Sequence, residues 1–244
     1  MRPFLILQLR PEADASDAEF AAFLAKGDLQ ASRARRLRLE SQDLPGDLDL
    51  ADYAGVIVGG GPGCVSDDPE GKDPAEARAE AQILSLMPQI TAQDIPFLGC
   101  CYGIGILAHH LGAEVSKARF GENASAVACQ ITAEGLDDPL LAGLPDRFDA
   151  FVGHKEAVQA LPPGCVHLLQ SDPCPFQMIR YKTNVYATQF HPEADPDVFA
   201  ERVRIYRHRG YFPPETAGAL IEMCYASDVT VPERILQNFF RRYG

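Results

Sequence analysis

The chain has 244 residues, of which 46% are hydrophobic and 23% charged, a composition typical of a soluble globular protein. Its formal net charge of -12 argues against a general nucleic-acid-binding protein, because such a chain repels a phosphate backbone. The apolar run at residues 4–9 is too short for a signal-peptide core or a membrane span. Seven cysteines without regular spacing indicate a reducing compartment, so we expect a cytoplasmic protein with no membrane partner.

Strand-like apolar runs alternate with helix-like stretches through the first half of the chain. Strands are expected at residues 4–9, 37–40, 55–58 and 95–99. Between the last two, the sequence predicts a helix with Asp73 as N-cap, Pro74 at its first position and Glu76 three residues after the cap. We expect this helix to end before Pro88. The alternation predicts an α/β fold, a three-layer α/β/α sandwich with a mostly parallel central sheet.

The second half changes to shorter β-prone segments at residues 124–132 and 165–170, which favours an antiparallel or mixed extension of the sheet. Residues 184–190 predict a further strand. Helix starts are expected at Asp195-Pro196, at Pro213-Pro214 and at Pro232, and the last helix carries one apolar face formed by Ile235, Leu236, Phe239 and Phe240. We therefore expect a single domain over residues 1–244, with residues 195–244 as a helical C-terminal extension.

Although the net charge of the chain is negative, its arginines form two clusters. The clusters are Arg33, Arg35, Arg36 and Arg38, and Arg202, Arg204, Arg207 and Arg209. We interpret both as solvated helix or strand faces rather than as nucleic-acid sites.

A Gly-x-Cys-x-Gly turn follows the expected strand at residues 95–99. Glycines two residues before and two residues after a nucleophile allow a sharp strand-to-helix turn that exposes its side chain, and this spacing selects Cys101 rather than Cys100. The positive end of the following helix is expected to lower the pKa of the Cys101 thiol. Taken alone, the turn also suits a buried structural cysteine or a phosphate-binding loop.

A second chemical motif, His191-Pro192-Glu193, follows the expected strand at residues 184–190. An imidazole at the end of that strand would lie at the same sheet edge as Cys101, and a carboxylate two residues later can orient the ring. The sequence therefore predicts Cys101 as nucleophile, His191 as general base and then acid, and Glu193 as the group that fixes the tautomer.

A glycine-rich loop at residues 59–63 follows the expected strand at residues 55–58. Its backbone N–H groups, that of Gly61 in particular, could stabilise an oxyanion together with the N–H of Tyr102. A dinucleotide-binding loop is disfavoured, because Pro62 interrupts the loop and no clear Gly-x-Gly-x-x-Gly register is present.

Together the three motifs resemble those of the class I glutamine amidotransferases. The family's Gly-Gly-Pro loop is matched by Gly60-Gly61-Pro62, its Gly-x-Cys-x-Gly turn by residues 99–103, and its His-Pro-Glu by residues 191–193. The resemblance implies a flavodoxin-like sheet and hydrolysis of a γ-glutamyl amide through a γ-glutamyl thioester. No cofactor is expected, and no metal, because the sequence contains no CxxC pair or HExxH stretch.

Within the family the chain is most similar to stand-alone proteins related to the amidotransferase domain of GMP synthase. The segments that carry this similarity are residues 138–141, 151–158 and 161–164. The resemblance implies that the segment of His154 lies beside the active site, that Lys155 and Glu156 contact the substrate through their backbone, and that Gly60 also belongs to the substrate site.

Two departures from the family bear on the substrate. Most members carry glutamine two residues after the second glycine of the turn, where it helps to hold the substrate glutamine, and this chain has Gly105. Loss of such a contact weakens recognition by about 1–3 kcal/mol, while removal of the side chain also opens room. No sequence for a synthetase domain follows Glu193, so an ammonia acceptor is expected on a separate synthetase subunit.

Three functions remain open at this point. The first is a glutaminase that releases ammonia or an amine from a γ-glutamyl substrate, glutamine or an analogue. The second is a γ-glutamyl peptidase acting on small peptides or glutathione-like conjugates, and the third is a non-catalytic binding subunit. The intact triad weighs against the third, and the sequence leaves a homodimer open.

Overall fold

The computed structural model describes residues 1–209 and 211–244. In these residues the larger sheet has nine strands in the order β2-β1-β3-β4-β11-β10-β9-β6-β7. The parallel half comprises β2 (Ala34–Arg38), β1 (Phe4–Gln8), β3 (Gly55–Val58), β4 (Phe97–Cys100) and β11 (Val185–Thr188). The antiparallel half comprises β10 (Met178–Tyr181), β9 (Cys165–Gln170), β6 (Glu122–Ile131) and β7 (Arg147–His154), and a separate pair joins β5 (Val115–Ser116) to β8 (Ala157–Val158).

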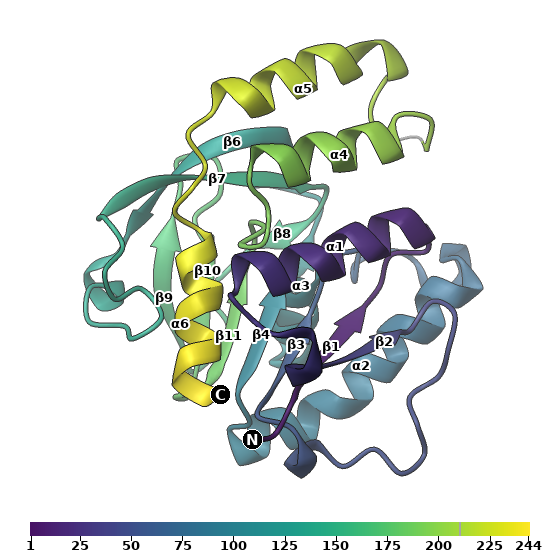
Figure 1. The fold of residues 1–244 in the computed structure, drawn as a ribbon, viewed down its shortest axis with the longest axis vertical. Coiled ribbons are helices and arrows are strands. Elements are labelled where there is room, and N and C mark those ends of the chain that lie inside the picture. The colour runs from purple at the N-terminus through teal and green to yellow at the C-terminus, as the bar shows by residue number, and fades with distance from the viewer. Residues whose placement is uncertain (210) are drawn as a thin grey trace.

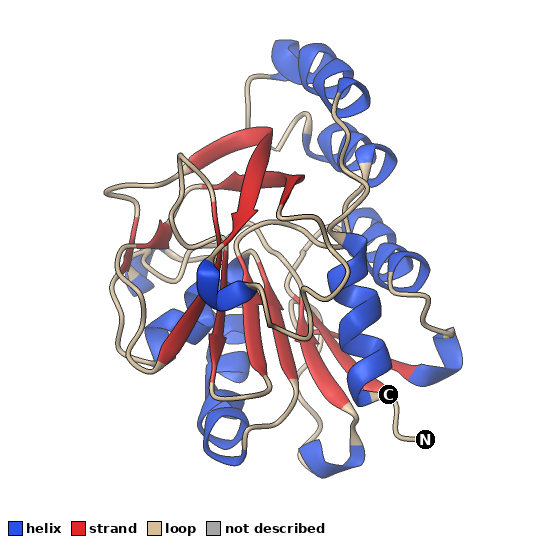
Figure 2. Ribbon diagram, turned by 90° about the vertical axis from the view of Figure 1, so that its left-hand side faces the viewer, coloured by secondary structure: helices blue, strands red, loops and turns tan. Residues whose placement is uncertain are grey.

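Helices cover both faces of the parallel half, as Figures 1 and 2 show. Helices α1 (Ala13–Lys26) and α6 (Glu233–Tyr243) pack on one face, and α2 (Pro74–Gln93) and α3 (Tyr102–His110) pack on the other. Successive side chains of β1 alternate between the two cores, since Phe4 and Ile6 join the first and Leu5 and Leu7 the second. The prediction of a three-layer sandwich with a mostly parallel sheet is confirmed, and the order 2-1-3-4-11 is that of flavodoxin-like folds.

The antiparallel half confirms the expected extension of the sheet, although the sequence indicated only β6 and β9 within it. Helices α4 (Pro196–Tyr206) and α5 (Ala217–Ala226) form a hairpin that packs over β6 and β7 (Figure 1). Phe151 of β7 and Phe199 of α4 stack with ring centroids 4.6 Å apart, which anchors the hairpin on the sheet.

Two predicted element boundaries are wrong. The second strand lies at Ala34–Arg38 and not at residues 37–40, because an edge strand needs few buried residues and its arginines remain partly solvated. Helix α2 continues through Pro88 to Gln93. Pro88 is exposed, whereas Met87 and Ile90 are fully buried. Burial of this inner face maintains the helix although proline has no backbone N–H to donate to the preceding turn.

The last helix confirms its predicted apolar face. Ile235, Leu236, Phe239 and Phe240 are all buried, and the rings of Phe239 and Phe240 lie 5.9 Å and 4.8 Å from that of Phe4 on β1. The division of the chain at residue 195 stays a prediction. Within residues 1–209 and 211–244, no helix combines the length and the apolar character that crossing a membrane requires.

Replacing Phe239 with alanine tests how much α6 contributes to the core. We expect Phe239→Ala to lower the free energy of unfolding by about 3–5 kcal/mol, because it leaves a cavity between α6 and β1. Urea denaturation measures the change. Tyr225→Ala is the control, since Tyr225 is 53% exposed on α5 and should cost no more than about 0.5 kcal/mol. Equal losses for the two variants would contradict this account of the core.

Candidate active site

Cys101 stands between β4 and α3 in a strained backbone conformation, with φ 54° and ψ -93°. A non-glycine residue in that region costs of order 1–3 kcal/mol and persists only where its surroundings hold it. A Cβ atom at Gly99 would lie only 2.8 Å from the backbone of Gly103, so the turn closes only with glycine there. The N–H of Cys101 donates to the carbonyl of Thr188 at 2.8 Å, which ties the turn to the end of β11.

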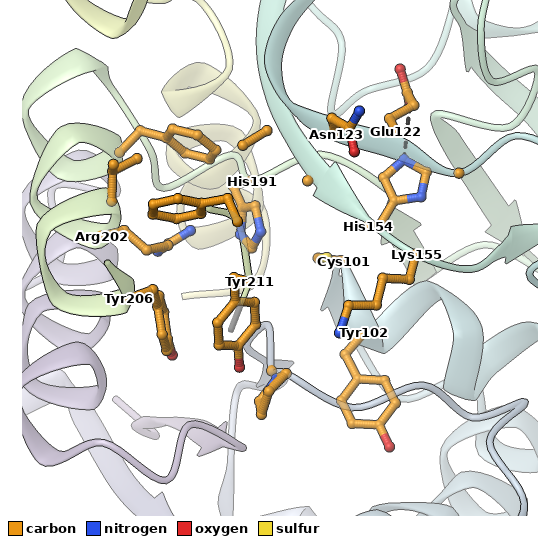
Figure 3. Close-up of a pocket in the computed structure, with 18 of the residues that line it drawn as sticks. Cys101, Tyr102, Glu122, Asn123, His154, Lys155, His191, Arg202, Tyr206 and Tyr211 are labelled. Carbon is orange, nitrogen blue, oxygen red and sulfur yellow. Dashed lines mark hydrogen bonds and ion pairs between the residues drawn. The ribbon is translucent and has the colours of Figure 1, made fainter. Parts of the chain in front are cut away.

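His191 follows β11 by three residues and is held by Glu193. The Nδ1 of His191 and the Oε1 of Glu193 are 2.9 Å apart, and both side chains are almost wholly buried. With Nδ1–H donating to the carboxylate, Nε2 is the nitrogen left to exchange a proton with a substrate or a thiol. His191 and Cys101 line the same cavity, and Figure 3 shows both facing it.

Arg202 of α4 contacts the carboxylate of Glu193. Its Nη2 donates to Oε1 of Glu193 at 2.9 Å, the same oxygen that faces His191, and its side chain is 11% exposed. Our interpretation of Arg202 as part of a solvated face is therefore wrong. A charge-assisted bond to a fully buried carboxylate fixes that carboxylate and links the helical hairpin to the triad.

Burial sets the protonation of the resting site. It raises the pKa of the Cys101 thiol to about 12, an effect that the positive charge of Arg10 partly opposes. The sequence predicted a lowered pKa for this thiol, and the net shift is in the opposite direction because burial outweighs the favourable charges. Burial also lowers the pKa of His191, with Glu193 opposing the shift and Arg202 and Arg10 adding to it. At neutral pH these shifts favour a thiol at Cys101 and a neutral imidazole at His191, and a neutral imidazole can accept a proton.

The predicted oxyanion and substrate residues meet at this cavity with the exception of Gly60, which does not line it; the cavity volume is about 690 Å³. Gly61, Tyr102, Lys155 and Glu156 line it together with Cys101 and His191. A Cβ at Gly61 would lie 3.1 Å from the Tyr102 ring, so the glycine loop packs directly against the start of α3.

Gly60 lies against the ring of His191. Its N–H donates to Oε1 of Glu19 at 3.2 Å, so this donor is already engaged. A Cβ at Gly60 would lie 2.6 Å from Cε1 of His191 and 2.8 Å from Nη2 of Arg10. Glycine is therefore required here because two functional side chains approach the backbone from the same side.

The carboxylate of Glu156 occupies the space beside Gly105. A Cβ at Gly105 would lie 2.9 Å from its Oε1. The same carboxylate accepts the backbone N–H groups of Val65 and Ser66 at 2.8 Å and 2.9 Å, and the Ser66 hydroxyl at 2.6 Å. The expectation that Gly105 opens room is therefore wrong, because Glu156 fills that room and secures the loop that follows the Gly-Gly-Pro sequence.

His154 fixes the segment that carries Lys155 and Glu156. Its Nδ1 donates to the carbonyl of Glu156 at 2.8 Å, and its Nε2 lies 2.7 Å from Oε2 of Glu122. Glu122, His154 and Cys174 offer ligand atoms within 4.8 Å of one another. The direct hydrogen bond between two of the three makes this cluster a brace for the site wall.

Sequence reasoning missed Arg10, Glu19 and Tyr206. Buried Arg10 follows β1, its Nε donates to Glu19 at 2.7 Å, and its Nη1 donates to the Tyr206 hydroxyl at 3.1 Å. The only available signal was a charged residue directly after an apolar strand, at the edge where ligands of α/β proteins bind.

The fold and this site bring a thiol, an imidazole and a carboxylate together at one edge of a mostly parallel α/β sheet. Residues 29–204 match the model of the family described as glutamine amidotransferase class-I. The chain belongs to the class I glutamine amidotransferase family and is an enzyme of that type.

Curated relatives agree with this assignment, and solved structures share the fold. The chain is 32% identical to the GMP synthase [glutamine-hydrolyzing] of Thermomicrobium roseum over 68% of its own length and 29% of that protein, and 37% identical to that of Thermosipho melanesiensis over 45% of its length and 21% of that protein. The matched part of this chain thus covers less than a third of the length of each of these relatives. A glutamine amidotransferase structure from Thermotoga maritima superposes over 100% of this chain and 98% of its own, with a TM-score of 0.76 at 20% identity. A glutamine amidotransferase structure from Methylobacillus flagellatus superposes over 100% of this chain and 94% of its own, with a TM-score of 0.74 at 24% identity.

Replacing Gly99 with alanine tests the turn. We expect Gly99→Ala to lower the free energy of unfolding by about 1–3 kcal/mol, because the added methyl group meets the backbone of Gly103. Gly46→Ala is the matched control, since a Cβ at Gly46 meets no atom within 4 Å and should change stability by less than about 0.5 kcal/mol. Thermal unfolding of both variants measures the difference, and a neutral Gly99→Ala would contradict the close approach.

Proposed function

We propose that this protein hydrolyses a γ-glutamyl amide through a γ-glutamyl thioester on Cys101, releasing ammonia or an amine. The observation that carries the proposal is the pairing of a strained, cavity-facing thiol with a neutral His191 held by Glu193. The family membership supports the γ-glutamyl group, since the relatives are named as glutamine-hydrolysing.

In the first half of the reaction, His191 accepts the thiol proton as Sγ of Cys101 attacks the γ-carbonyl carbon. The N–H groups of Gly61 and Tyr102 stabilise the oxyanion of the tetrahedral intermediate. The imidazolium then donates its proton to the leaving nitrogen as the C–N bond breaks. Glu193, fixed by Arg202, stabilises the imidazolium in the meantime.

In the second half, His191 removes a proton from water, which attacks the thioester and restores the thiol with release of glutamate. The backbone of Lys155 and Glu156 holds the amino-acid end of the glutamyl group. Gly60 contributes by leaving free the space that His191 needs.

A second candidate function is delivery of ammonia to a separate synthetase subunit. The likeness to part of a GMP synthase favours it. An ammonia-delivering subunit must release ammonia from glutamine at Cys101, so assay of ammonia and glutamate from L-glutamine distinguishes it from an enzyme that accepts only larger γ-glutamyl amides.

Removal of the nucleophile tests the proposal directly. We expect Cys101→Ala to reduce glutamate release from γ-glutamyl amides by about 10³-fold or more, because no thioester can form. Cys100→Ala is the matched control, since Cys100 is the preceding residue and points into the core of α1 and α6. Coupled glutamate dehydrogenase measures the rates. Activity that survives Cys101→Ala, or that Cys100→Ala abolishes instead, would refute the assignment.

The protonation of His191 predicts the pH profile. His191 must be neutral to accept the thiol proton and its pKa is lowered, so activity should persist as the pH falls below about 6.5, the ordinary histidine value, before it is lost. The positive charge of Arg202 contributes to the lowering. Arg202→Gln should therefore move the acid limb of kcat/KM to higher pH, whereas Arg204→Gln on the exposed side of the same helix should not. An unmoved limb in Arg202→Gln would contradict this coupling.

A further inference from the structure

We infer that the leaving group is an amino acid with a large apolar side chain, so that the preferred substrates are γ-glutamyl dipeptides. The inference rests on the proposed function and specifies which γ-glutamyl amide is cut. Two features of the cavity carry it, an apolar wall formed by the helical hairpin and a guanidinium beside the catalytic histidine.

The cavity extends well beyond the reacting atoms. Its volume of about 690 Å³ lies within the range of roughly 300–1,000 Å³ typical of sites for drug-sized ligands. The glutamyl group takes part of this volume, and a leaving ammonia, which is a single heavy atom, would leave the part lined by the hairpin unfilled. The part of the lining that comes from α4, α5 and their connection is mainly apolar or aromatic: Phe199, Val203, Tyr206, Tyr211, Phe212 and Leu220.

The arrangement around Cys101 separates the two ends of a substrate. Figure 3 shows His191 and Arg202 on one side of Cys101 and Lys155 on the other. His191 must reach the leaving nitrogen to protonate it, so the amine lies on the side of His191 and the hairpin. The glutamyl end then lies on the side of Lys155 and Glu156.

Arg10 supplies a donor on the leaving-group side. Its Nε and Nη1 are engaged by Glu19 and Tyr206, while in residues 1–209 and 211–244 its Nη2 has no hydrogen-bond partner. The side chain is 5% exposed and lines the cavity. Its Nη2 and Cε1 of His191 approach the same point beside Gly60. A free guanidinium nitrogen of a largely buried arginine in this position suits the α-carboxylate of an amino acid bonded through its nitrogen to the scissile carbonyl.

Glu19 orients Arg10 for this contact. Its carboxylate also accepts Nε2 of Gln8 at 2.9 Å and the N–H of Gly60, so the guanidinium is held from fixed backbone and strand positions. The apolar wall then receives the side chain of the leaving amino acid, and Arg10 receives its carboxylate. The reaction is unchanged: the C–N bond breaks, His191 protonates the amino nitrogen, and water later releases glutamate from Cys101.

Four substrates, tested on the wild-type protein, separate the contribution of the apolar wall from that of Arg10. γ-Glutamylphenylalanine has both the side chain and the carboxylate, γ-glutamylphenethylamide has only the ring, γ-glutamylglycine has only the carboxylate, and glutamine has neither. We expect kcat/KM for γ-glutamylphenylalanine to exceed those of the two intermediate substrates by about 10-fold or more, and that of glutamine by more still. Values for glutamine equal to or above those for γ-glutamylphenylalanine would overturn the inference while leaving the proposed function intact. Absence of Cys101-dependent glutamate from all four would refute the proposed function itself.

Variants of Arg10 and Phe212 test which residues recognise the carboxylate and the side chain of the leaving amino acid. Arg10→Gln should reduce the preference for γ-glutamylphenylalanine over the phenethylamide by about 10-fold or more, and this ratio is independent of the fraction of protein that folds. Phe212→Ala should reduce the preference for γ-glutamylphenylalanine over γ-glutamylglycine. Arg204→Gln, on α4 outside the cavity, should change neither ratio. An unchanged carboxylate preference in Arg10→Gln would overturn the role of Arg10.

Discussion

The parallel pairing of β4 with β11 is the constraint on which the active site depends. Because the two strands run in the same direction, Cys101 after one and His191 after the other emerge at a single sheet edge. The hydrogen bond from the Cys101 N–H to Thr188 joins those ends directly. It also helps to hold the strained backbone at Cys101, whose turn closes only because Gly99 brings no side chain against the next helix.

Buried charges around this edge serve orientation more than stability. Removing ions from water costs several kcal/mol each, so buried pairs add little net stability even when well bonded. Glu193 faces both His191 and Arg202, and Glu19 faces Arg10, so each carboxylate fixes a cation or an imidazole beside the cavity. The same burial raises the pKa of the Cys101 thiol and lowers that of His191, which favours the neutral form of both groups.

The cavity is shaped by different groups on the two sides of Cys101. On the glutamyl side, Glu156 fills the space beside Gly105 and secures the loop through Val65 and Ser66. On the other side, the hairpin of α4 and α5 contributes an aromatic wall. The contacts on the two sides therefore come from segments far apart in the sequence, the Glu156 loop and the helical hairpin.

The sequence by itself determined what depends on local spacing: the three motifs, the α/β layering, β3 to the residue, and the buried face of α6. It misplaced β2 and ended α2 at Pro88, because edge pairing and burial against the sheet overrode local preference. Only the tertiary structure decided the roles of Arg10, Arg202 and Glu156 and the pKa of Cys101. These depend on side chains from distant segments meeting in a cavity that excludes water, and residue spacing along the chain carries no measure of that burial.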